Sequence, residues 1–381
     1  MTNIELSAAI IMLVSFVSFI VGLYSKGNAT LEQIQDTVRT SSALNLSQIG
    51  HMKQLVSNLS EASSPEWNTD NTHLQALKAY LDKSEMLYSD VETEYRRRKL
   101  LVREGLVLPT SFKIGTRHNY TATGLEQLVD VTAQYISVID TLINVATSKS
   151  AITKHPNQPN ILTCFEDTAT YKGSEYYQQH PNAHRLTLYH DDIECGNNVG
   201  SRAGVNKLTM FYMSVDGDSS NLETKGKLTS IHLVLVCHSS DITTYGYSAV
   251  LRPFIDDLMR LDCGIECVTN QGETQSLFAR LEHVAGDNLA ANQILGLVTS
   301  FTRSHFCRFC YVSAADAALY TNANDAPKRT KASHQKDVEM AAREPDSYKK
   351  TGVKGACVLD ELDYFSGIES TVPDVMLVLV F

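Results

Sequence analysis

HRLTLYHDDIE, from His184 to Glu194, is the stretch of sequence that decides the fold. Its apolar and polar residues alternate, which is typical of a β-strand with one buried face. The stretch ends in acidic residues, as expected of a strand that ends at the edge of a sheet. Two further strand candidates follow, GVNKLTMFYMSV (204–215) and KLTSIHLVLVCHSS (227–240), and DGDSSN (216–221) supplies turn-forming residues between them. The last candidate is almost continuously apolar, which predicts a strand buried on both faces.

An amphipathic helix and a fourth strand are predicted after these three strands. The helix is indicated by YSAVLRPFIDDLMRLDCGIEC (247–267), where Val250, Phe254 and Leu258 recur at spacing four. The segment LFARLEHVAGDN (277–288) then has strand character. Three successive strands, a helix and a fourth strand form the opening of a ribonuclease-H-like domain. We therefore expect a mixed α/β (α+β) fold with a ribonuclease-H-like mixed sheet and helices.

Three regions are expected along the chain. Residues 1–150 are interpreted as a helical N-terminal region, 151–304 as the ribonuclease-H-like core, and 305–381 as a Cys-x-x-Cys zinc-type insertion followed by a truncated C-terminal segment. Within the first region, the apolar spacing of TLEQIQDTV (30–38) and an apolar pattern over 125–147 both indicate helices.

The acids at the strand ends suggest a metal site. In the expected topology the first and fourth strands lie side by side, so Asp191 or Asp192 could share metals with Asp287. Two Mg²⁺ or Mn²⁺ ions held by such carboxylates can activate water and stabilise a leaving oxygen in phosphodiester cleavage. Glu194 is a further candidate ligand nearby. The alternative is that these are ordinary loop acids, which are common at strand ends.

A second candidate metal site lies in SHFCRFC (304–310), which holds His305, Cys307 and Cys310. A short Cys-x-x-Cys turn can direct two thiolates at one Zn²⁺ ion, and His334 or Cys357 could complete a tetrahedral set. A redox-active pair is a weaker alternative because the βαβ context is absent, and two incidental thiols are the third interpretation.

Composition narrows the class of protein. The 381 residues are 43% hydrophobic and 20% charged, as in an ordinary globular protein, and a net charge of −10 argues against a surface that binds nucleic acid throughout. A local basic patch is still present at Arg96, Arg97, Arg98 and Lys99, which could be a solvated helix end or could contact phosphates. The eight cysteines are too sparse for a disulfide scaffold, which favours a reducing compartment.

The N-terminal apolar run from Leu6 to Tyr24 has no charged residue over 19 positions, close to the length needed to cross a bilayer. A membrane anchor would agree with the glycosylation sequons at four asparagines, Asn28, Asn45, Asn58 and Asn119. Against it, Lys26 is the only basic residue near the run, and Glu5 stands where a signal peptide carries positive charge. The other interpretation is a buried helix.

From about Tyr95 to Met376 the chain resembles transposases of cut-and-paste DNA elements related to the En/Spm (CACTA) group, and host proteins derived from them. The resemblance rests on the order of four stretches, EYRRRKLLVREGLVLPTSFKIG (94–115), LYHDDIECGNNVGSRAGVNKLTMFYMSV (188–215), YGYSAVLRPFIDDLMRLDCGIEC (245–267) and GDNLAANQILGLVTSFTRSHFCRFC (286–310). It implies metal-dependent DNA strand cleavage and transfer at a DDE-type site, with Asp287 as the second catalytic acid. Transposon DNA is the implied partner, a homo-oligomer is an allowed state, and the location is nuclear or cytoplasmic.

Departures from this family set the remaining expectations. The family has Pro where this chain has Asn198, and relatives continue past PDVM (373–376) into further sequence where a third carboxylate lies. This chain ends in LVLVF, so we expect a truncated or frame-shifted copy with an incomplete or inactive site. The similarity of FIVGLYSKGNATLEQIQDTV (19–38) to the family favours a buried N-terminal helix. The alternative function is a non-catalytic interaction protein, either retained from a transposon or membrane-anchored by a single pass through residues 6–24.

Overall fold

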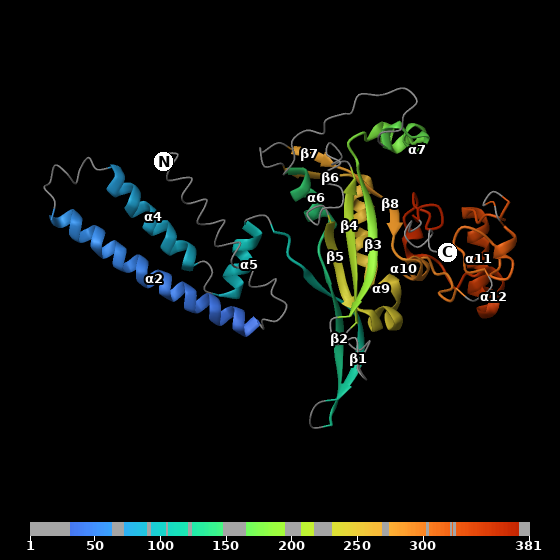
Figure 1. The fold of residues 1–381 in the computed structure, drawn as a ribbon, viewed down its shortest axis with the longest axis horizontal. Helices are drawn as coiled ribbons and strands as arrows, with labels where there is room; N and C mark the ends of the chain where they lie inside the picture. Colours follow the sequence, from blue (N-terminus) through green and yellow to red (C-terminus); the bar gives the residue numbers. More distant parts are fainter. Residues whose placement is uncertain are drawn as a thin grey trace. The chain divides into compact units, whose positions relative to one another are not determined.

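The computed structural model is a mixed α/β protein, as expected (Figure 1). It describes residues 31–62, 72–89, 93–103, 106–120, 124–147, 165–194, 207–216, 231–268, 274–301, 305–320, 322 and 325–372. The chain divides into two compact units, Met1–Leu108 and Pro109–Phe381.

The first unit is helical in its described part. It consists of α2 (Leu31–Ala62), α4 (Thr72–Ser89) and α5 (Glu94–Arg103). Helices α2 and α4 pack together through a small apolar cluster of Ile49, Val56 and Leu81. Beside this cluster, the Nζ atom of Lys53 lies 2.5 Å from Oδ1 of Asp82.

The apolar run from Leu6 to Tyr24 lies outside the described residues, so neither the anchor nor the buried helix can be compared with the structure. Among the helices that the structure describes, none combines the length and the apolar character needed to span a bilayer.

A six-stranded mixed sheet forms the centre of the second unit, with strand order β1-β2-β5-β4-β3-β8. Its strands are β1 (Thr110–Tyr120), β2 (Glu126–Tyr135), β3 (His184–Glu194), β4 (Lys207–Asp216), β5 (Ile231–His238) and β8 (Ala279–Ala285). Strands β3, β4 and β5 form an antiparallel meander, and β8 pairs with β3 in parallel. The four strands and the intervening helix therefore occur where the sequence predicts them.

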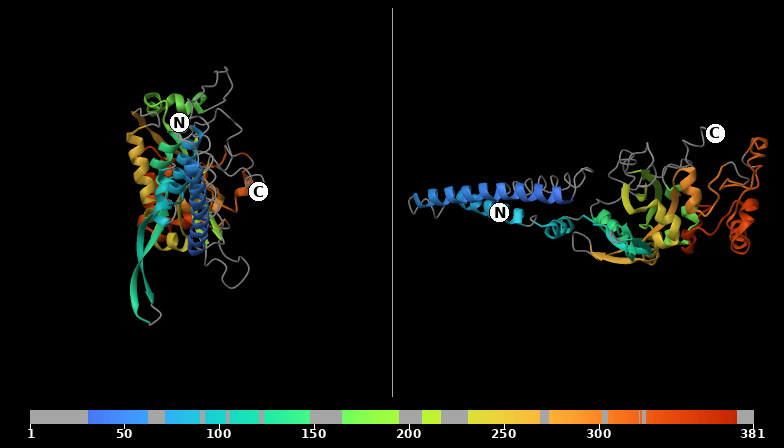
Figure 2. Two further views of the ribbon diagram at one scale, coloured as in Figure 1. Left: turned by 90° about the vertical axis from the view of Figure 1, so that its left-hand side faces the viewer. Right: turned by 90° about the horizontal axis from the view of Figure 1, so that it is seen from below.

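The prediction of a helical region up to residue 150 is wrong for residues 110–120 and 126–135, which form β1 and β2. The segment 125–147, expected to be one helix, is β2 followed by the short helix α6 (Val138–Thr147). In β2 every second residue of the last half is buried, at Val131, Ala133 and Tyr135, which is strand and not helix periodicity. Only the end of β2 pairs with β5, and the β1–β2 ribbon extends beyond the other strands (Figures 1 and 2).

Helix α9 (Ser239–Cys263) lies along one face of this sheet (Figure 1). It buries a row of apolar side chains there, namely Val250, Leu251, Phe254, Ile255, Leu258 and Leu261. Each fully buried side chain of this kind contributes roughly 1.5–3 kcal/mol relative to its exposed state. The helix is interrupted at Gly246, whose φ of 81° lies in the left-handed region that glycine adopts without strain.

Shorter elements complete the second unit. The α-helices are α7 (Ala169–Gly173), α8 (Glu175–Gln179), α10 (Asn288–Ile294), α11 (Lys331–Arg343) and α12 (Tyr348–Thr351). A two-stranded sheet joins β6 (Ile265–Val268) to β7 (Thr274–Leu277), and the 3₁₀ turns are η1 (Phe165–Asp167), η3 (Ala317–Leu319), η4 (Pro345–Ser347) and η5 (Val358–Glu361). Helices α11 and α12 lie on the β8 side of the main sheet (Figure 1).

Candidate functional site

The carboxylate of Asp192 in β3 is held by three side chains, two from strand β4 and one from helix α9. Asp192 stands opposite Thr209 of β4, and its Oδ1 accepts hydrogen bonds from the hydroxyls of Thr209 and Ser239, the second at 3.1 Å. Its Oδ2 lies 2.9 Å from the Nζ of Lys207. Ser239 is the first residue of α9, so the end of β3, the start of β4 and the start of α9 meet at this carboxylate.

The electrostatic balance at Asp192 favours its ionised form. Burial alone would raise the pKa of Asp192, but the hydrogen bonds from Thr209, Lys207 and Ser239, together with the charge of Lys207, outweigh burial and lower this pKa below its usual value. Asp192 is therefore a carboxylate at neutral pH, and its charge is offset by the lysine.

Asp191 faces the opposite side of the sheet, because successive side chains of a strand alternate between faces. It is exposed, stands opposite Met210, and its Oδ1 accepts a hydrogen bond of 2.8 Å from the backbone N–H of Asp192. Burial is the main cause that raises the pKa of Tyr212, and the negative charge of Asp191 raises it further. Of the two neighbouring acids, Asp192 is the one on the side of α9.

Asp287 follows β8 and begins helix α10. Its Oδ1 accepts a hydrogen bond of 2.6 Å from the backbone N–H of Ala290, which is the usual role of an aspartate before a helix. Because β8 is parallel to β3 and its last pair joins Tyr189 to Ala285, Asp287 and the acidic end of β3 lie at the same edge of the sheet.

His190 is a buried residue among these acids that the sequence patterns did not single out. Its side chain is stacked on Phe211 with ring centres 4.8 Å apart, and its Nε2 lies 3.3 Å from the hydroxyl of Tyr247. Its Nδ1 is buried and hydrogen-bonds to no atom of the described chain. Burial lowers the pKa of His190, and the charges of three acids, Asp192, Asp191 and Asp287, offset this only in part. We therefore treat His190 as neutral at pH 7.

A cavity of about 520 Å³ opens beside Asp192. Its lining includes Lys207 from β4, Ser239 and Thr243 from α9, and Lys354 from the segment after α12. Sequence reasoning missed both lysines, because neither belongs to a motif and they meet only through the fold. This volume falls in the range of small-molecule sites.

The three acids do not form a ligand set for the predicted pair of Mg²⁺ or Mn²⁺ ions in this arrangement. Both oxygens of Asp192 are engaged by Lys207 and hydroxyls, Asp287 caps a helix, and Asp191 is on the other face of the sheet. No group of three or more His, Cys, Asp or Glu side chains within the described ranges could hold a metal ion. Glu194, the further candidate ligand, does not complete such a group with the three aspartates within the described residues.

The thiols of Cys307 and Cys310 are neighbours. Burial is the main cause that raises the pKa of Cys310, and a contact with Cys307 raises it further. The Sγ of Cys307 also accepts a hydrogen bond of 3.4 Å from the backbone N–H of Phe309. The predicted pairing of two thiols in one short turn is thus present, and both cysteines are free.

The other predicted zinc ligands do not join the two thiols. His334 lies buried in α11, where the charges that act on it are those of Asp360, Arg329 and Asp337, and both of its ring nitrogens lack a hydrogen-bond partner among the described residues. Burial is the main cause that lowers the pKa of His334. His305 precedes the turn and has a φ of 59°.

Cys357, the remaining candidate, is buried, and its pKa is raised mainly by burial and then by the charge of Asp360. The described residues therefore place the two thiols together without a third ligand from His305, His334 or Cys357.

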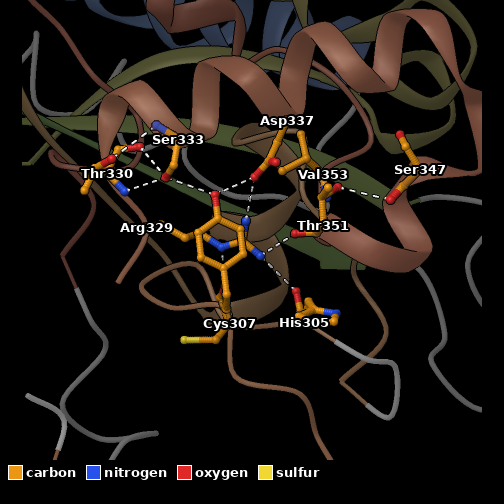
Figure 3. A network of polar contacts seen from close by, with 10 residues as sticks. His305, Cys307, Arg329, Thr330, Ser333, Asp337, Ser347, Thr351 and Val353 are labelled. Atoms are coloured by element: carbon orange, nitrogen blue, oxygen red, sulfur yellow. Dashed lines mark hydrogen bonds and ion pairs between the residues drawn. The ribbon is translucent and has the colours of Figure 1, made fainter. Parts of the chain in front are cut away.

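The buried side chain of Arg329 holds the Cys-x-x-Cys segment in place (Figure 3). It donates hydrogen bonds to the carbonyl oxygens of Cys307 at 2.9 Å, His305 at 3.2 Å and Thr351 at 2.5 Å. Its NH1 also lies 3.4 Å from Oδ2 of Asp337. Figure 3 shows the sulfur of Cys307 directed away from this network. An arginine network, which requires no metal, thus connects the segment to α11 and α12.

The basic cluster of α5 divides into buried and exposed members. Arg97 is buried and donates a hydrogen bond to Oε1 of Gln35 in α2, so its guanidinium is engaged inside the helical unit. Arg96, Arg98 and Lys99 are exposed, and Arg98 lies 3.8 Å from Glu94 on the same helix.

No family model matches this chain, and no curated protein matches it.

Proposed function

We propose that this chain is a transposase-derived protein built around a ribonuclease-H-like domain that includes residues 184–294. The strand order β5-β4-β3-β8, with α9 between β5 and β8 in the chain, supports this fold. The observation that carries the functional proposal is the parallel pair β3 and β8, which lead into Asp192 and Asp287. The charges of both acids act on the buried side chain of His190.

In this proposal the chain binds DNA, but the ribonuclease-H-like domain does not cleave it in the arrangement described. Phosphodiester cleavage by a two-metal site requires carboxylate oxygens that are free to bind both cations. The oxygens of Asp192 are engaged by Lys207, Thr209 and Ser239, so metal binding would first have to break the ion pair between Asp192 and Lys207. The exposed Arg96, Arg98 and Lys99 supply positive charge for the DNA backbone. A protein that acts on transposon DNA would work in the nucleus.

The test uses the purified chain with supercoiled plasmid and duplex DNA, in Mg²⁺, in Mn²⁺ and in EDTA. We expect salt-dependent binding to duplex DNA and no nicking in any of the three conditions. Metal-dependent nicking that Asp287→Ala abolishes, and that the exposed-acid control Asp363→Ala retains, would show that the site is catalytic. Absence of any DNA binding would contradict the proposal as a whole.

A second candidate function is a non-catalytic interaction protein. One face of α2 exposes Leu44, Met52 and Leu55, with 62%, 44% and 48% of their surface accessible. Three large apolar side chains on one helix face favour a contact with another surface. Size measurement in solution separates the two functions, because the interaction function predicts an assembly whose size is unaffected by DNA.

A further inference from the structure

We propose that the cavity beside Asp192 binds the phosphate monoester of a nucleotide through Lys207 and Lys354, without a divalent metal. The nucleotide part of this ligand rests on the proposed function, whereas recognition of the phosphate rests on the cavity itself.

The charge of the cavity differs in sign from that of the chain. Its charged lining residues are Lys207, Lys354 and Asp192, two positive and one negative, whereas the whole chain has a net charge of −10. One positive charge in excess remains after Lys207 has offset Asp192. Lysine is a common ligand of phosphate groups, which it binds as a compact positive charge with three donors.

Hydroxyl donors are also present around the cavity. Ser240 and Thr299 line it, and neither hydroxyl is engaged by another side chain within the described residues. Hydroxyls and ammonium groups together are the donors that phosphate oxygens accept from. The volume of about 520 Å³ has room for a mononucleotide, since small-molecule sites of 300 to 1,000 Å³ are usual.

The backbone fixes Lys354 at this cavity. The backbone N–H of Lys354 donates a hydrogen bond of 2.8 Å to the carbonyl of Gly296, and Leu297 pairs with Val353 as an isolated bridge. Gly296 has a φ of 67°, and a Cβ atom there would lie 2.3 Å from the carbonyl oxygen of Gly355. Only glycine allows this close approach, which brings a lysine from a distant part of the sequence to the side of Asp192.

The test measures binding of two matched probes, deoxyadenosine monophosphate and deoxyadenosine, by calorimetry in EDTA. We expect the monophosphate to bind and the nucleoside to bind at least tenfold more weakly. Lys354→Gln should weaken binding of the monophosphate by about tenfold, since a charged hydrogen bond is lost. The control Lys349→Gln, at an exposed lysine paired with Asp346 at 2.9 Å, should leave binding unchanged.

A second arm identifies the source of the phosphate. A short oligonucleotide with a 5′-phosphate and one with a 5′-hydroxyl are compared as competitors of the monophosphate. Stronger competition by the phosphorylated oligonucleotide indicates a DNA end as the ligand, and equal competition indicates a free nucleotide.

Several results would overturn the proposal. These are equal affinity for both probes, binding that requires Mg²⁺, and unchanged affinity in a Lys354→Gln protein whose thermal unfolding matches that of the parent. Binding to duplex DNA is measured separately, so its presence without phosphate binding would reject this inference and leave the proposed function intact. The reverse result would reject the proposed function and leave the phosphate site.

Discussion

The Nζ atom of Lys207 lies 2.9 Å from Oδ2 of Asp192, across two neighbouring antiparallel strands. This ion pair, with the hydroxyls of Thr209 and Ser239, lowers the pKa of Asp192 against the effect of burial. A carboxyl group whose pKa is lower in the folded than in the unfolded chain stabilises the fold above its unfolded pKa, and this stability is lost as the pH falls through the folded value.

The first prediction follows from the lowered pKa of Asp192. The parent protein should lose stability below about pH 4, the ordinary pKa of an aspartate, and Asp192→Asn should show a smaller loss over the same range. At pH 7 the variant should be less stable by about 1 kcal/mol, because Lys207 loses its anionic partner while water still reaches its half-exposed ammonium group. Urea unfolding at pH 3 to 7 measures both effects. If the unfolding free energies of the two proteins fall equally between pH 7 and pH 3, this pH dependence does not come from Asp192.

The second prediction concerns His190. Burial lowers its pKa, so the unfolded chain binds a proton more readily than the folded chain. The stability is therefore fully present above about pH 6.5, the unfolded value, and decreases as the pH falls below it. His190→Gln should reduce this decrease between pH 6.5 and 5, as measured by the urea midpoint.

A second histidine serves as a comparison for His190. His334 is also buried and its pKa is also lowered, so His334→Gln should remove a separate part of the same pH dependence. An unchanged profile in the His190→Gln protein would show that this imidazole does not titrate with folding.

The third prediction tests the docking of the β1–β2 ribbon. A Cβ atom at Gly115 would lie 2.2 Å from the ring of Tyr245, whose hydroxyl donates a hydrogen bond of 2.8 Å to the carbonyl of Thr116. Gly115→Ala should therefore cost about 1–3 kcal/mol of unfolding free energy, as overpacking does. The added change Tyr245→Leu should recover part of this loss. Gly50→Ala in α2, where the Cβ meets no atom within 4 Å, should instead stabilise by about 0.5–1 kcal/mol.

The sequence predicts the parts of this fold that have a local period. Strand β3 and helix α9 could be identified because burial leaves a repeat of two or of nearly four within each segment, and β5 could be identified from its almost continuous apolar run. Strand β2 was missed because its alternation covers only Val131, Ala133 and Tyr135 and is followed at once by the apolar helix α6.

The site was less predictable than the fold. Asp192 and Asp287 were expected at strand ends, but the pairing of Asp192 with Lys207 depends on the register of two strands, which the sequence does not specify. Lys354 reaches the same cavity only because the backbone at Gly296 permits a close approach. Contacts of this kind connect distant residues and leave no local pattern.

The fourth prediction separates the members of the basic cluster in α5. Arg97→Gln should destabilise the fold by about 1–3 kcal/mol, because the buried guanidinium donates to Gln35. Arg98→Gln changes an exposed side chain and should alter stability by less than about 0.5 kcal/mol. If the cluster contacts DNA, Arg98→Gln should lower the slope of log affinity against log salt by about 1. A slope unchanged by this substitution would remove the cluster from the DNA-binding surface.

The fifth prediction asks what holds the Cys-x-x-Cys segment in place. Arg329→Gln should cost about 3–5 kcal/mol, since it leaves Asp337 and the carbonyl oxygens of Cys307 and Thr351 without their buried donor. Cys307→Ser should cost less than half of this, because among the described residues its thiol interacts with Cys310 and with the backbone N–H of Phe309. Thermal unfolding of both variants, with and without a strong chelator, gives the comparison. A loss of stability on chelation that equals the effect of Cys307→Ser, together with one zinc ion per purified chain, would establish a metal and not Arg329 as the organising element.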